Sequence, residues 1–278
     1  MRIIETIAEW KLIKRSSRGS WGLIPTMGFL HDGHLSLIRR GCSENENTIV
    51  SIFINPTQFG QGEDLAQYPK AIESDLEALR REGVDVVFLP STQEMYPSGF
   101  DTLVVPGDLA IRLEGRSRPN HLTGVATVVC KLFSIFQPDR AYFGQKDFQQ
   151  YLVIDRISRD LNLGVEVVLG ETIRSSDGLA LSSRNSYLSD TERLAAGILY
   201  QALTKAHYLY RNGARNCKDL KDAMMSIINS EHVVSLDYLS IGNVETLDEL
   251  EVIETTAIIT IAAWVGSARL IDNIYLSE

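Results

Sequence analysis

The chain has 278 residues, of which 44% are hydrophobic and 23% are charged, and its formal net charge is -9. This ordinary globular composition excludes a disordered protein, and the length allows one large core or two domains. The negative net charge and the lack of a basic run argue against nucleic acid as the main partner, because phosphate backbones are bound through clustered Lys and Arg.

The first half of the chain alternates between short apolar strands and amphipathic helices. In chain order, we predict strand 22–25, helix 34–40, strand 48–54, helix 70–82, strand 84–89, helix 121–136, strand 141–143, a helix after residue 147 and strand 165–169. Such alternation predicts an α/β fold, with a Rossmann-like parallel sheet and helices on both of its faces.

The pattern changes after about residue 174. A loop rich in Ser and Gly is followed by predicted helices at 191–211 and 218–228 and then by closely spaced strands, which is typical of a smaller α+β domain. We therefore predict a Rossmann-like domain over 1–174 and an α+β domain over 175–278 that acts as a lid.

The cysteines and the apolar segments predict a cytoplasmic protein without a membrane partner. Cys42, Cys130 and Cys217 are odd in number and form no C-x-x-C pair, which argues against a disulfide framework and a zinc site. The N-terminal sequence lacks the apolar stretch of a signal peptide. The longest apolar segment, 257–265, is too short to span a bilayer. The apolar strand material over 257–270 is able to bury an interface.

Ligands of an open parallel sheet bind beyond the carboxyl ends of its strands, where PTMGFLHDGH at 25–34 follows a predicted strand. Its glycines allow a ligand to approach the backbone, and His34 falls at a predicted helix start, where N–H groups and the helix dipole bind phosphate. The dipole also favours a neutral His34 that donates a hydrogen bond or a proton. The alternative is a glycine turn with two surface histidines; a metal pair would lack a third ligand.

Two further segments follow strands. NPTQF at 55–59 offers neutral amides for the hydroxyl and carboxylate oxygens of a small substrate, although a capped turn is the alternative. FGQKDFQQ at 143–150 places Lys146 where it would supply positive charge to phosphates, with Asp147 holding that lysine or a magnesium-bound water. The alternative for Lys146 is a solvated surface charge.

Two more segments offer anion-binding groups. DGLALSSRN at 177–185 supplies hydroxyls, backbone donors and Arg184 for a loop that closes on a triphosphate, unless it is only a polar linker. EGRSRP at 114–119 adds two arginines after a predicted strand, one of which would neutralise a carboxylate or phosphate.

The segments PTMGFLHDGH, INPTQF, YP, RPNHLTG, FGQKDFQQ and DGLALSSRN occur in an order that closely resembles the pantothenate synthetase family, the pantoate-β-alanine ligases. The match runs from about residue 25 to 185 and extends weakly into AAWVGSARLIDN. This family belongs to the nucleotidyltransferases with a His-Ile-Gly-His motif, represented here by residues 31–34, while residues 182–184 stand in place of a Lys-Met-Ser-Lys-Ser loop.

The resemblance implies condensation of (R)-pantoate with β-alanine to pantothenate through a pantoyl adenylate, with AMP and pyrophosphate released. It implies ATP with Mg²⁺ as co-substrate, no tightly bound organic cofactor and a homodimer. The implied catalytic residues are His34, as the proton donor, His31, Lys146 and Arg184.

The resemblance also implies which residues bind each substrate. The ATP site would comprise Met27, Gly28, Phe29, Leu30, His31, Asp32, Gly33, His34, Gly144, Gln145, Lys146, Asp147, Ile173, Leu181, Ser182, Ser183 and Arg184. The pantoate site would comprise Pro25, Thr26, Gln58 and Gln150, and the β-alanine site Gln58, Tyr68 and Arg118.

One residue departs from the family and two rival functions stay open. Gln145 stands where the family usually has glutamate, so a metal or lysine contact through that position is in question. One rival is a nucleotidyltransferase that adenylates a phosphorylated substrate, against which the neutral Gln58 and Gln150 argue. The other is a nucleotide-binding regulatory module without catalysis, against which the intact His34, Lys146 and Arg184 argue.

Overall fold

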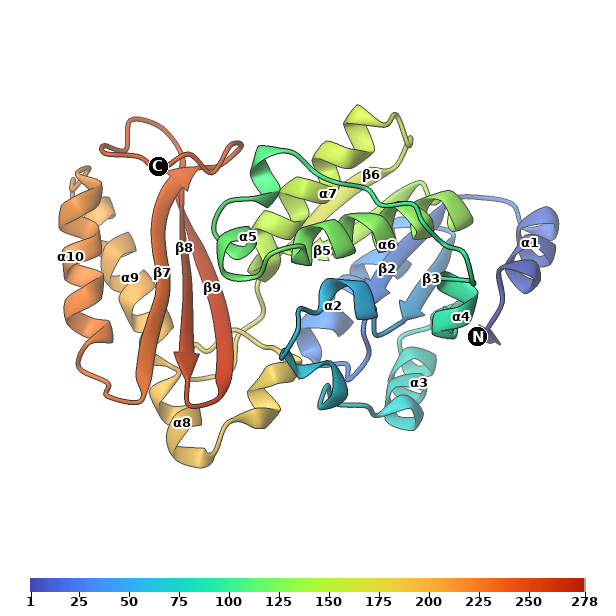
Figure 1. The fold of residues 1–278 in the computed structure, drawn as a ribbon, viewed down its shortest axis with the longest axis horizontal. Helices are drawn as coiled ribbons and strands as arrows, with labels where there is room; N and C mark the ends of the chain where they lie inside the picture. The colour runs from blue at the N-terminus through green and yellow to red at the C-terminus, as the bar shows by residue number, and fades with distance from the viewer. Residues whose placement is uncertain (278) are drawn as a thin grey trace. The chain divides into compact units, whose positions relative to one another are not determined.

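Six parallel strands form one sheet in the computed structural model, which describes residues 1–277. The strands are β1 Arg2–Ile4, β2 Trp21–Thr26, β3 Asn47–Ile52, β4 Val86–Phe88, β5 Arg140–Gly144 and β6 Glu166–Gly170. Their order across the sheet is β1-β4-β3-β2-β5-β6 (Figure 1). From β2 the chain proceeds to β3 and β4 on one side and later to β5 and β6 on the other, so a topological switch point lies between β2 and β5.

Helices cover both faces of this sheet, as the sequence predicts. They are α1 Ile7–Ser16, α2 Asp32–Glu44, α3 Ile72–Arg81, α6 His121–Phe136 and α7 Phe148–Asp160. Leu23 and its neighbour Ile24 point to opposite faces because side chains alternate along a strand. Leu23 shares a buried cluster with residues of α1, α6 and α7, and Ile24 shares another with residues of α2 and α3.

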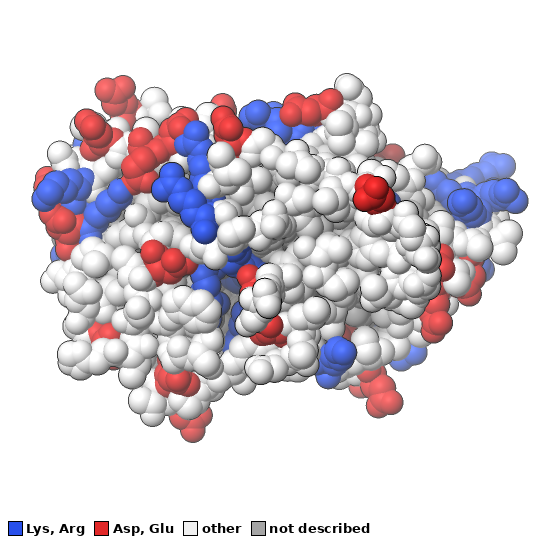
Figure 2. Space-filling view, in the orientation of Figure 1, with Lys and Arg blue, Asp and Glu red and all other residues white. Residues whose placement is uncertain are grey.

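The first strand and helix, β1 and α1, are not predicted from the sequence. β1 has only three residues, and its pattern gives no periodicity to read. α1 is fixed by Trp10, whose ring contacts those of Trp21 and Phe136 edge-on, with centroids 4.9 Å apart in both pairs. Figure 2 shows Lys and Arg side chains gathered over α1, where the Lys14 ammonium lies 5.9 Å from the Trp10 ring centroid.

Short helices fill the connections between these elements. They are η1 Pro56–Gln58, η2 Asp64–Ala66, α4 Thr92–Met95, η3 Asp108–Ala110, α5 Glu114–Ser117 and η4 Gln145–Asp147. The strand expected before Glu114 is wrong, because η3 and α5 occupy that stretch. The apolar residues 103–105 pair with no strand in the described chain, and an apolar run forms a strand only where a sheet accepts its backbone.

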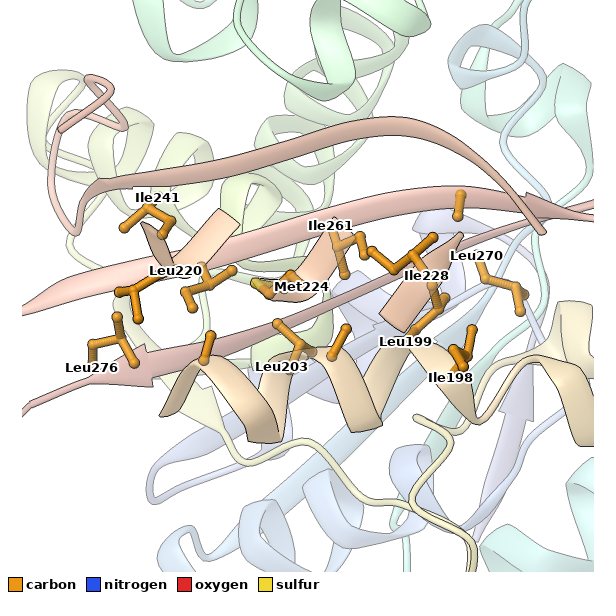
Figure 3. Close-up of a cluster of buried hydrophobic side chains, with 14 of the residues drawn as sticks. Ile198, Leu199, Leu203, Leu220, Met224, Ile228, Ile241, Ile261, Leu270 and Leu276 are labelled. Atoms are coloured by element: carbon orange, nitrogen blue, oxygen red, sulfur yellow. The ribbon is translucent and has the colours of Figure 1, made fainter. Parts of the chain in front are cut away.

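The second sheet is antiparallel and has three strands, β7 Val234–Asn243, β8 Ala257–Val265 and β9 Ala268–Leu276, with β8 in the middle. It packs against α9 Ile198–Arg211 and α10 Cys217–Ile228 (Figure 1), and α8 Asp190–Ala195 precedes them. In Figure 3, Leu203 of α9, Met224 of α10 and Ile261 of β8 point toward one another. The single helix predicted at 191–211 is two helices.

The apolar segment 257–265 is thus the central strand of this second sheet. All of its residues are buried within the chain except Trp264, which is 45% exposed. Most of its hydrophobic side chains therefore contribute to the core of unit 2. Among the described residues, no helix is long and apolar enough to cross a membrane.

The chain divides into two compact units, and each unit is made of two segments that are not contiguous in the sequence. Unit 1 comprises Met1–Gln145 and Gln149–Glu171. Unit 2 comprises Lys146–Phe148 together with the described residues from Thr172 onward. Lys146–Phe148 therefore belong with unit 2, although the residues on both sides of them in the chain belong to unit 1.

Candidate active site

The first candidate segment lies at the switch point of the parallel sheet. β2 ends at Thr26 and leads into the loop 27–31, while the neighbouring strand β5 ends at Gly144. Because both strands run in the same direction, these ends lie at the same edge of the sheet. Open α/β sheets bind their ligands at this edge.

The loop after β2 needs glycine at its start. Gly28 has φ +83°, and a Cβ there would lie 2.9 Å from Cγ2 of Ile52 and 3.2 Å from Oδ2 of Asp75. Phe29 follows with φ +52°, a left-handed conformation that is uncommon for a bulky residue. A strained backbone of this kind persists only where the surroundings hold it.

Asp75 supplies that support from α3. Its side chain is 2% exposed, and its two carboxylate oxygens accept hydrogen bonds from the backbone N–H groups of Phe29 and Leu30, each at 2.8 Å. Hydrogen bonds to a charged acceptor are about twice as strong as neutral ones. A carboxylate absent from the predicted site therefore fixes the predicted ATP-binding loop.

His31 and His34 meet at the first turn of α2. The helix begins at Asp32, with His31 as its N-cap, so His34 lies inside the first turn and not at the start. Nδ1 of His31 accepts a hydrogen bond from Gly33 N–H at 3.1 Å, and Nδ1 of His34 accepts one from His31 N–H at 3.3 Å. The two ring centroids are 4.0 Å apart.

These hydrogen bonds determine where each histidine ring carries its proton. A ring nitrogen that accepts a hydrogen bond has no hydrogen of its own, so the neutral ring holds its proton on Nε2. His31 and His34 therefore offer paired Nε2–H donors at the positive end of α2. That combination suits phosphate oxygens.

Gln58 is positioned beside this loop by Asn55. The side chain of Asn55 is 1% exposed and donates from Nδ2 to Oε1 of Gln58 at 3.0 Å and to the carbonyl of Gly124 at 3.1 Å. Gln58 in turn directs its Nε2 toward Sδ of Met27 at 3.2 Å. A predicted pantoate residue and a predicted ATP residue are thus in contact.

The approach of α6 to η1 explains the glycine in RPNHLTG. A Cβ on Gly124 would lie 2.3 Å from the carbonyl oxygen of Thr57 and 2.6 Å from the nitrogen of Gln58. No side chain fits in that space, so only glycine allows the two backbones to come this close. The close packing of α6 against η1 thereby fixes the position of the Gln58 backbone.

Arg118 is held by Glu63 and His121, and Oε2 of Glu114 lies 3.9 Å from its Nη1. Its guanidinium forms a bidentate ion pair with Glu63, at 2.9 and 2.6 Å, and Nη1 lies 3.1 Å from Nε2 of His121. Since arginine only donates, Nε2 of His121 accepts and Nδ1 carries the proton, which it donates to the carbonyl of Gln58 at 2.9 Å. Desolvation by burial lowers the pKa of His121 to about 4, so this ring is neutral at pH 7.

The other substrate residues predicted in unit 1 lie on named elements. Pro25 and Thr26 end β2, and the Thr26 hydroxyl donates to the carbonyl of Ser51 at 2.8 Å. Tyr68 is buried, at 6% exposure, and Gln150 is half-buried in the first turn of α7.

Lys146 lies in η4 and belongs to unit 2. Its Nζ is 3.2 Å from the carboxylate of Asp147, and its backbone carbonyl accepts a hydrogen bond from Nδ2 of Asn273 at 3.0 Å. The Lys146 side chain is 18% exposed and that of Asp147 is 43% exposed. Gly144 and Gln145, which precede them, belong to unit 1.

The predicted ATP residues after 172 also belong to unit 2. Leu181 N–H donates to the carbonyl of Ile173 at 3.0 Å, which brings these two together. The Ser182 hydroxyl accepts from Arg184 N–H at 3.3 Å and caps η5 (Ser183–Tyr187). Ser183 is 5% exposed and Arg184 is half-buried.

A charged pair holds the turn between Ile173 and Leu181. Asp177 pairs with Arg193 at 2.6 Å and accepts from the hydroxyl of Ser175 at 2.6 Å. The hydrogen bond from the Arg193 guanidinium, followed by that from Ser175, holds the pKa of the Asp177 carboxyl well below its usual range. This carboxylate is therefore charged at neutral pH.

The structure thus gathers the predicted residues into two sets. One set, in unit 1, comprises the segment 25–34 with Gln58, Tyr68, Arg118, Gly144, Gln145 and Gln150. The other set, in unit 2, comprises Lys146, Asp147 and the predicted residues between 173 and 184. Within the described chain, no group of three or more His, Cys, Asp or Glu side chains is arranged to hold a metal ion.

Several supporting residues were not predicted as site residues. They are Asn55, Glu63, Asp75, His121 and Asn273. Asn55 and His121 lie inside the recognised motifs, and Asn273 ends the weakly matching segment AAWVGSARLIDN, which could have drawn attention to them. The roles of the others depend on contacts between distant segments.

The chain matches known proteins over nearly its whole length. The family model described as pantoate-beta-alanine ligase matches residues 2–275. A pantothenate synthetase of Roseiflexus castenholzii is 50% identical over 276 residues, which are 99% of this chain and 99% of that protein.

Solved structures agree with the sequence match. Pantothenate synthetase from Thermus thermophilus superimposes with a TM-score of 0.96 at 44% identity, covering 100% of both chains. Pantoate-beta-alanine ligase from Francisella tularensis, crystallised with beta-gamma ATP and beta-alanine, gives a TM-score of 0.83 at 35% identity, covering 99% of this chain and 97% of that one.

Proposed function

Since this chain belongs to the pantoate-beta-alanine ligase family, whose members form pantothenate from pantoate and β-alanine with ATP, we propose that it works through a pantoyl adenylate. The observation that carries this proposal is the pair of Nε2–H donors that His31 and His34 present at the N-terminus of α2, beyond the carboxyl end of β2. Neutral donors at a positive helix end suit a triphosphate.

The first half-reaction would activate the acid. A carboxylate oxygen of (R)-pantoate attacks the α-phosphorus of ATP, a new P–O bond forms, and the bond from that phosphorus to the bridging oxygen breaks. Pyrophosphate leaves with that oxygen and its electron pair. The product is pantoyl adenylate, whose carbonyl carbon now carries a leaving group that an amine is able to displace.

Charge repulsion is the main barrier to this step, because a carboxylate approaches a triphosphate. Lys146 and Arg184 would offset it, and His34 would donate its Nε2–H to the oxygens that gain charge, with His31 beside it. By comparison with oxyanion-hole donors, one such group contributes about 3 kcal/mol, or a factor of 100 or more in rate.

Pantoate would be recognised by neutral amides. Gln58 is buried, and Asn55 and His121 hold its side chain and its carbonyl from two sides. A fixed amide reads hydroxyl and carboxylate oxygens without the positive charge that a phosphorylated acceptor would require. We assign Gln150, Pro25 and Thr26 to the same substrate.

The second half-reaction would form the amide. The neutral amine of β-alanine attacks the carbonyl carbon, a C–N bond forms, the C–O bond to the phosphate breaks, AMP leaves and the amine releases a proton. Arg118, in position beside Gln58 through His121, would bind the β-alanine carboxylate, and we assign Gln58 and Tyr68 to the same substrate. Glu63 and His121 take three of the five donors of the guanidinium.

Magnesium fits this chain as an ion held mainly by the nucleotide. The described residues offer no cluster of ligands for a dedicated site, and Mg²⁺ commonly keeps several waters and binds through one or two carboxylates plus substrate phosphates. Asp147, with its partly exposed carboxylate, would contact a magnesium-bound water. When bound, the ion would neutralise phosphate charge.

The location, oligomeric state and domain roles of the enzyme can also be proposed. We assign it to the cytoplasm, in keeping with its free cysteines, and we propose that it acts as a homodimer. Residues 1–174 would bind nucleotide and pantoate, and residues 175–278 would close over the adenylate to exclude water.

Isotope exchange tests the proposed intermediate. Labelled pyrophosphate is incubated with the enzyme, ATP, Mg²⁺ and D-pantoate without β-alanine, and β-alanine is then added while AMP is measured. We expect pantoate-dependent exchange into ATP, followed by AMP release. A folded, ATP-binding protein that gives no exchange with pantoate does not form the adenylate, and the same assay with phosphorylated acceptors then tests the rival reaction.

A further inference from the structure

The backbone of Lys146 is tied to the second sheet by a residue outside the proposed site. Nδ2 of Asn273, in β9, donates to the carbonyl oxygen of Lys146 at 3.0 Å. Asn273 is 2% exposed, so water does not compete for this hydrogen bond. Asn273 follows Lys146 by 127 positions in the chain, and the contact therefore depends on the tertiary fold.

A second contact holds the same segment. The ring of Phe148 meets that of Tyr275 edge-on, with centroids 5.3 Å apart. Residues two apart on a strand face the same side, so Asn273 and Tyr275 present one surface of β9 to Lys146–Phe148. These contacts explain why Lys146–Phe148 lie with unit 2 while their chain neighbours lie with unit 1.

Asn273 is itself held in place. Its backbone N–H donates to Oδ1 of the buried Asp272 at 2.7 Å, and Asp272 forms a bidentate pair with Arg174 at 2.5 and 2.9 Å. The Arg174 guanidinium lies 4.1 Å from the ring centroid of Tyr200, in α9. The donor that meets Lys146 is therefore supported by a network of buried charge and aromatic contact.

A lysine ammonium sits at the end of a flexible four-carbon stem, so its position depends on how well its backbone is fixed. Lys146 lies in η4, a 3-10 helix of only three residues that gives little support by itself. The Asn273 hydrogen bond supplies that support at the residue whose charge the reaction would use.

We propose that Asn273 is a positioning residue for the adenylation step, because it fixes the backbone of Lys146 so that the ammonium meets the phosphates as charge develops on them. This inference rests on the role proposed above for Lys146. Asn273 would act through the Lys146 backbone and not by contact with substrate. The position of the lysine would then depend on contacts within unit 2.

A double-mutant cycle tests the coupling. Asn273→Ala and Asn273→Asp both remove the donor, and we expect each to lower the kcat of pantoate-dependent adenylation about three- to tenfold with little change in KM. In a Lys146→Ala background the same changes should alter the residual rate less than twofold. Equal losses in both backgrounds, or no loss in the parent enzyme, overturn the proposal.

Asn243→Ala is the matched control. Asn243 lies in the same sheet, and its Oδ1 accepts hydrogen bonds from Glu245 N–H at 2.8 Å and Thr246 N–H at 3.1 Å. It therefore tests the effect of losing a side chain-to-backbone contact in unit 2 away from Lys146. We expect its kcat to match that of the parent enzyme. A loss of kcat equal to that of Asn273→Ala would point to general loosening of the sheet and contradict the proposal.

Hydrogen exchange separates this inference from the proposed function. In the unliganded protein, Asn273→Ala should speed exchange in the peptide covering residues 144–150, and Asn243→Ala should not. If that difference appears while the parent enzyme shows no pantoate-dependent exchange of pyrophosphate, the contact holds and the proposed function fails. If the parent enzyme is active but the peptide is unaffected by Asn273→Ala, the positioning role fails.

Discussion

Oδ2 of Asp75 lies 2.8 Å from the backbone nitrogen of Phe29, a residue with φ +52°. Its buried carboxylate therefore stabilises a strained turn in the loop that precedes α2. Because the strain and its support lie on different elements, α3 stabilises the loop of the proposed nucleotide site through a contact with its backbone.

Asp75→Asn tests this support. The new amide would face one of the two N–H donors with an N–H₂ group, leaving a buried donor unsatisfied, so we expect a loss of about 1 to 3 kcal/mol in the free energy of unfolding. The KM for ATP should rise as the loop loosens. Urea unfolding and steady-state kinetics measure the two effects. Glu77→Gln on the exposed face of α3 is the control and should change neither, and an unaltered KM for ATP in Asp75→Asn would show that the loop does not need the carboxylate.

His34→Ala should lower kcat by about a hundredfold or more, since it removes the Nε2–H donor proposed to meet the phosphates. Pantoate-dependent pyrophosphate exchange measures this directly. His232→Ala, an exposed histidine, serves as the control. If folded His34→Ala protein keeps near-normal turnover, His34 has no part in the chemistry.

Because His121 is buried and neutral, we expect the free energy of unfolding to fall at acidic pH. Its pKa is about 4 in the folded protein and near 6.5 when unfolded, so between these pH values the unfolded chain binds the proton more readily. Stability from this group is complete above about pH 6.5 and falls as the pH decreases toward 4, by up to about 3 kcal/mol. Urea unfolding at about pH 7 and pH 4.5 measures the change.

His121→Gln is the matching variant for that experiment. Glutamine does not titrate, so the loss of stability between the two pH values should be smaller in the variant than in the parent protein. An equal loss in both would mean that other groups account for the acid sensitivity.

Gly124→Ala should damage both stability and pantoate binding. Its new Cβ would fall 2.3 Å from the carbonyl oxygen of Thr57, so η1 and α6 must separate. Overpacking of this kind typically costs about 1 to 3 kcal/mol, and Gln58 would move with η1. Thermal unfolding and the KM for pantoate report the result. Gly107→Ala, where an added Cβ has nothing within 4 Å, should leave both unchanged; an equal response at the two positions would refute the packing argument.

Local patterns predict much of the fold. The apolar strands that end at Pro or Asn, such as residues 48–54, and the amphipathic helices between them give the parallel sheet with helices on both faces. The motifs give the family, and they predict site residues such as Gln58, but those assignments stay predictions. β1 and α1 are missed because a three-residue strand and a helix fixed by distant aromatic rings carry little local pattern.

The supporting residues are hidden from the sequence for a different reason. Asp75 contacts Phe29 across 46 positions, His121 contacts Gln58 across 63, and Asn273 contacts Lys146 across 127. Their roles follow from tertiary contacts, which no periodicity or spacing reveals. Gln145 departs from the family's usual glutamate, and nothing in the structure explains that substitution.

The placement of Lys146–Phe148 limits how this protein is cut or recombined. A fragment ending at residue 171 would contain Lys146 but would leave its carbonyl and the Phe148 ring without Asn273 and Tyr275. A chimera that joins the first part of one family member to the second part of another must likewise match residues 146–148 to β9. Residues 146–148 and β9 must therefore come from the same parent, although they are far apart in the chain. A chimera joined at residue 171 separates them.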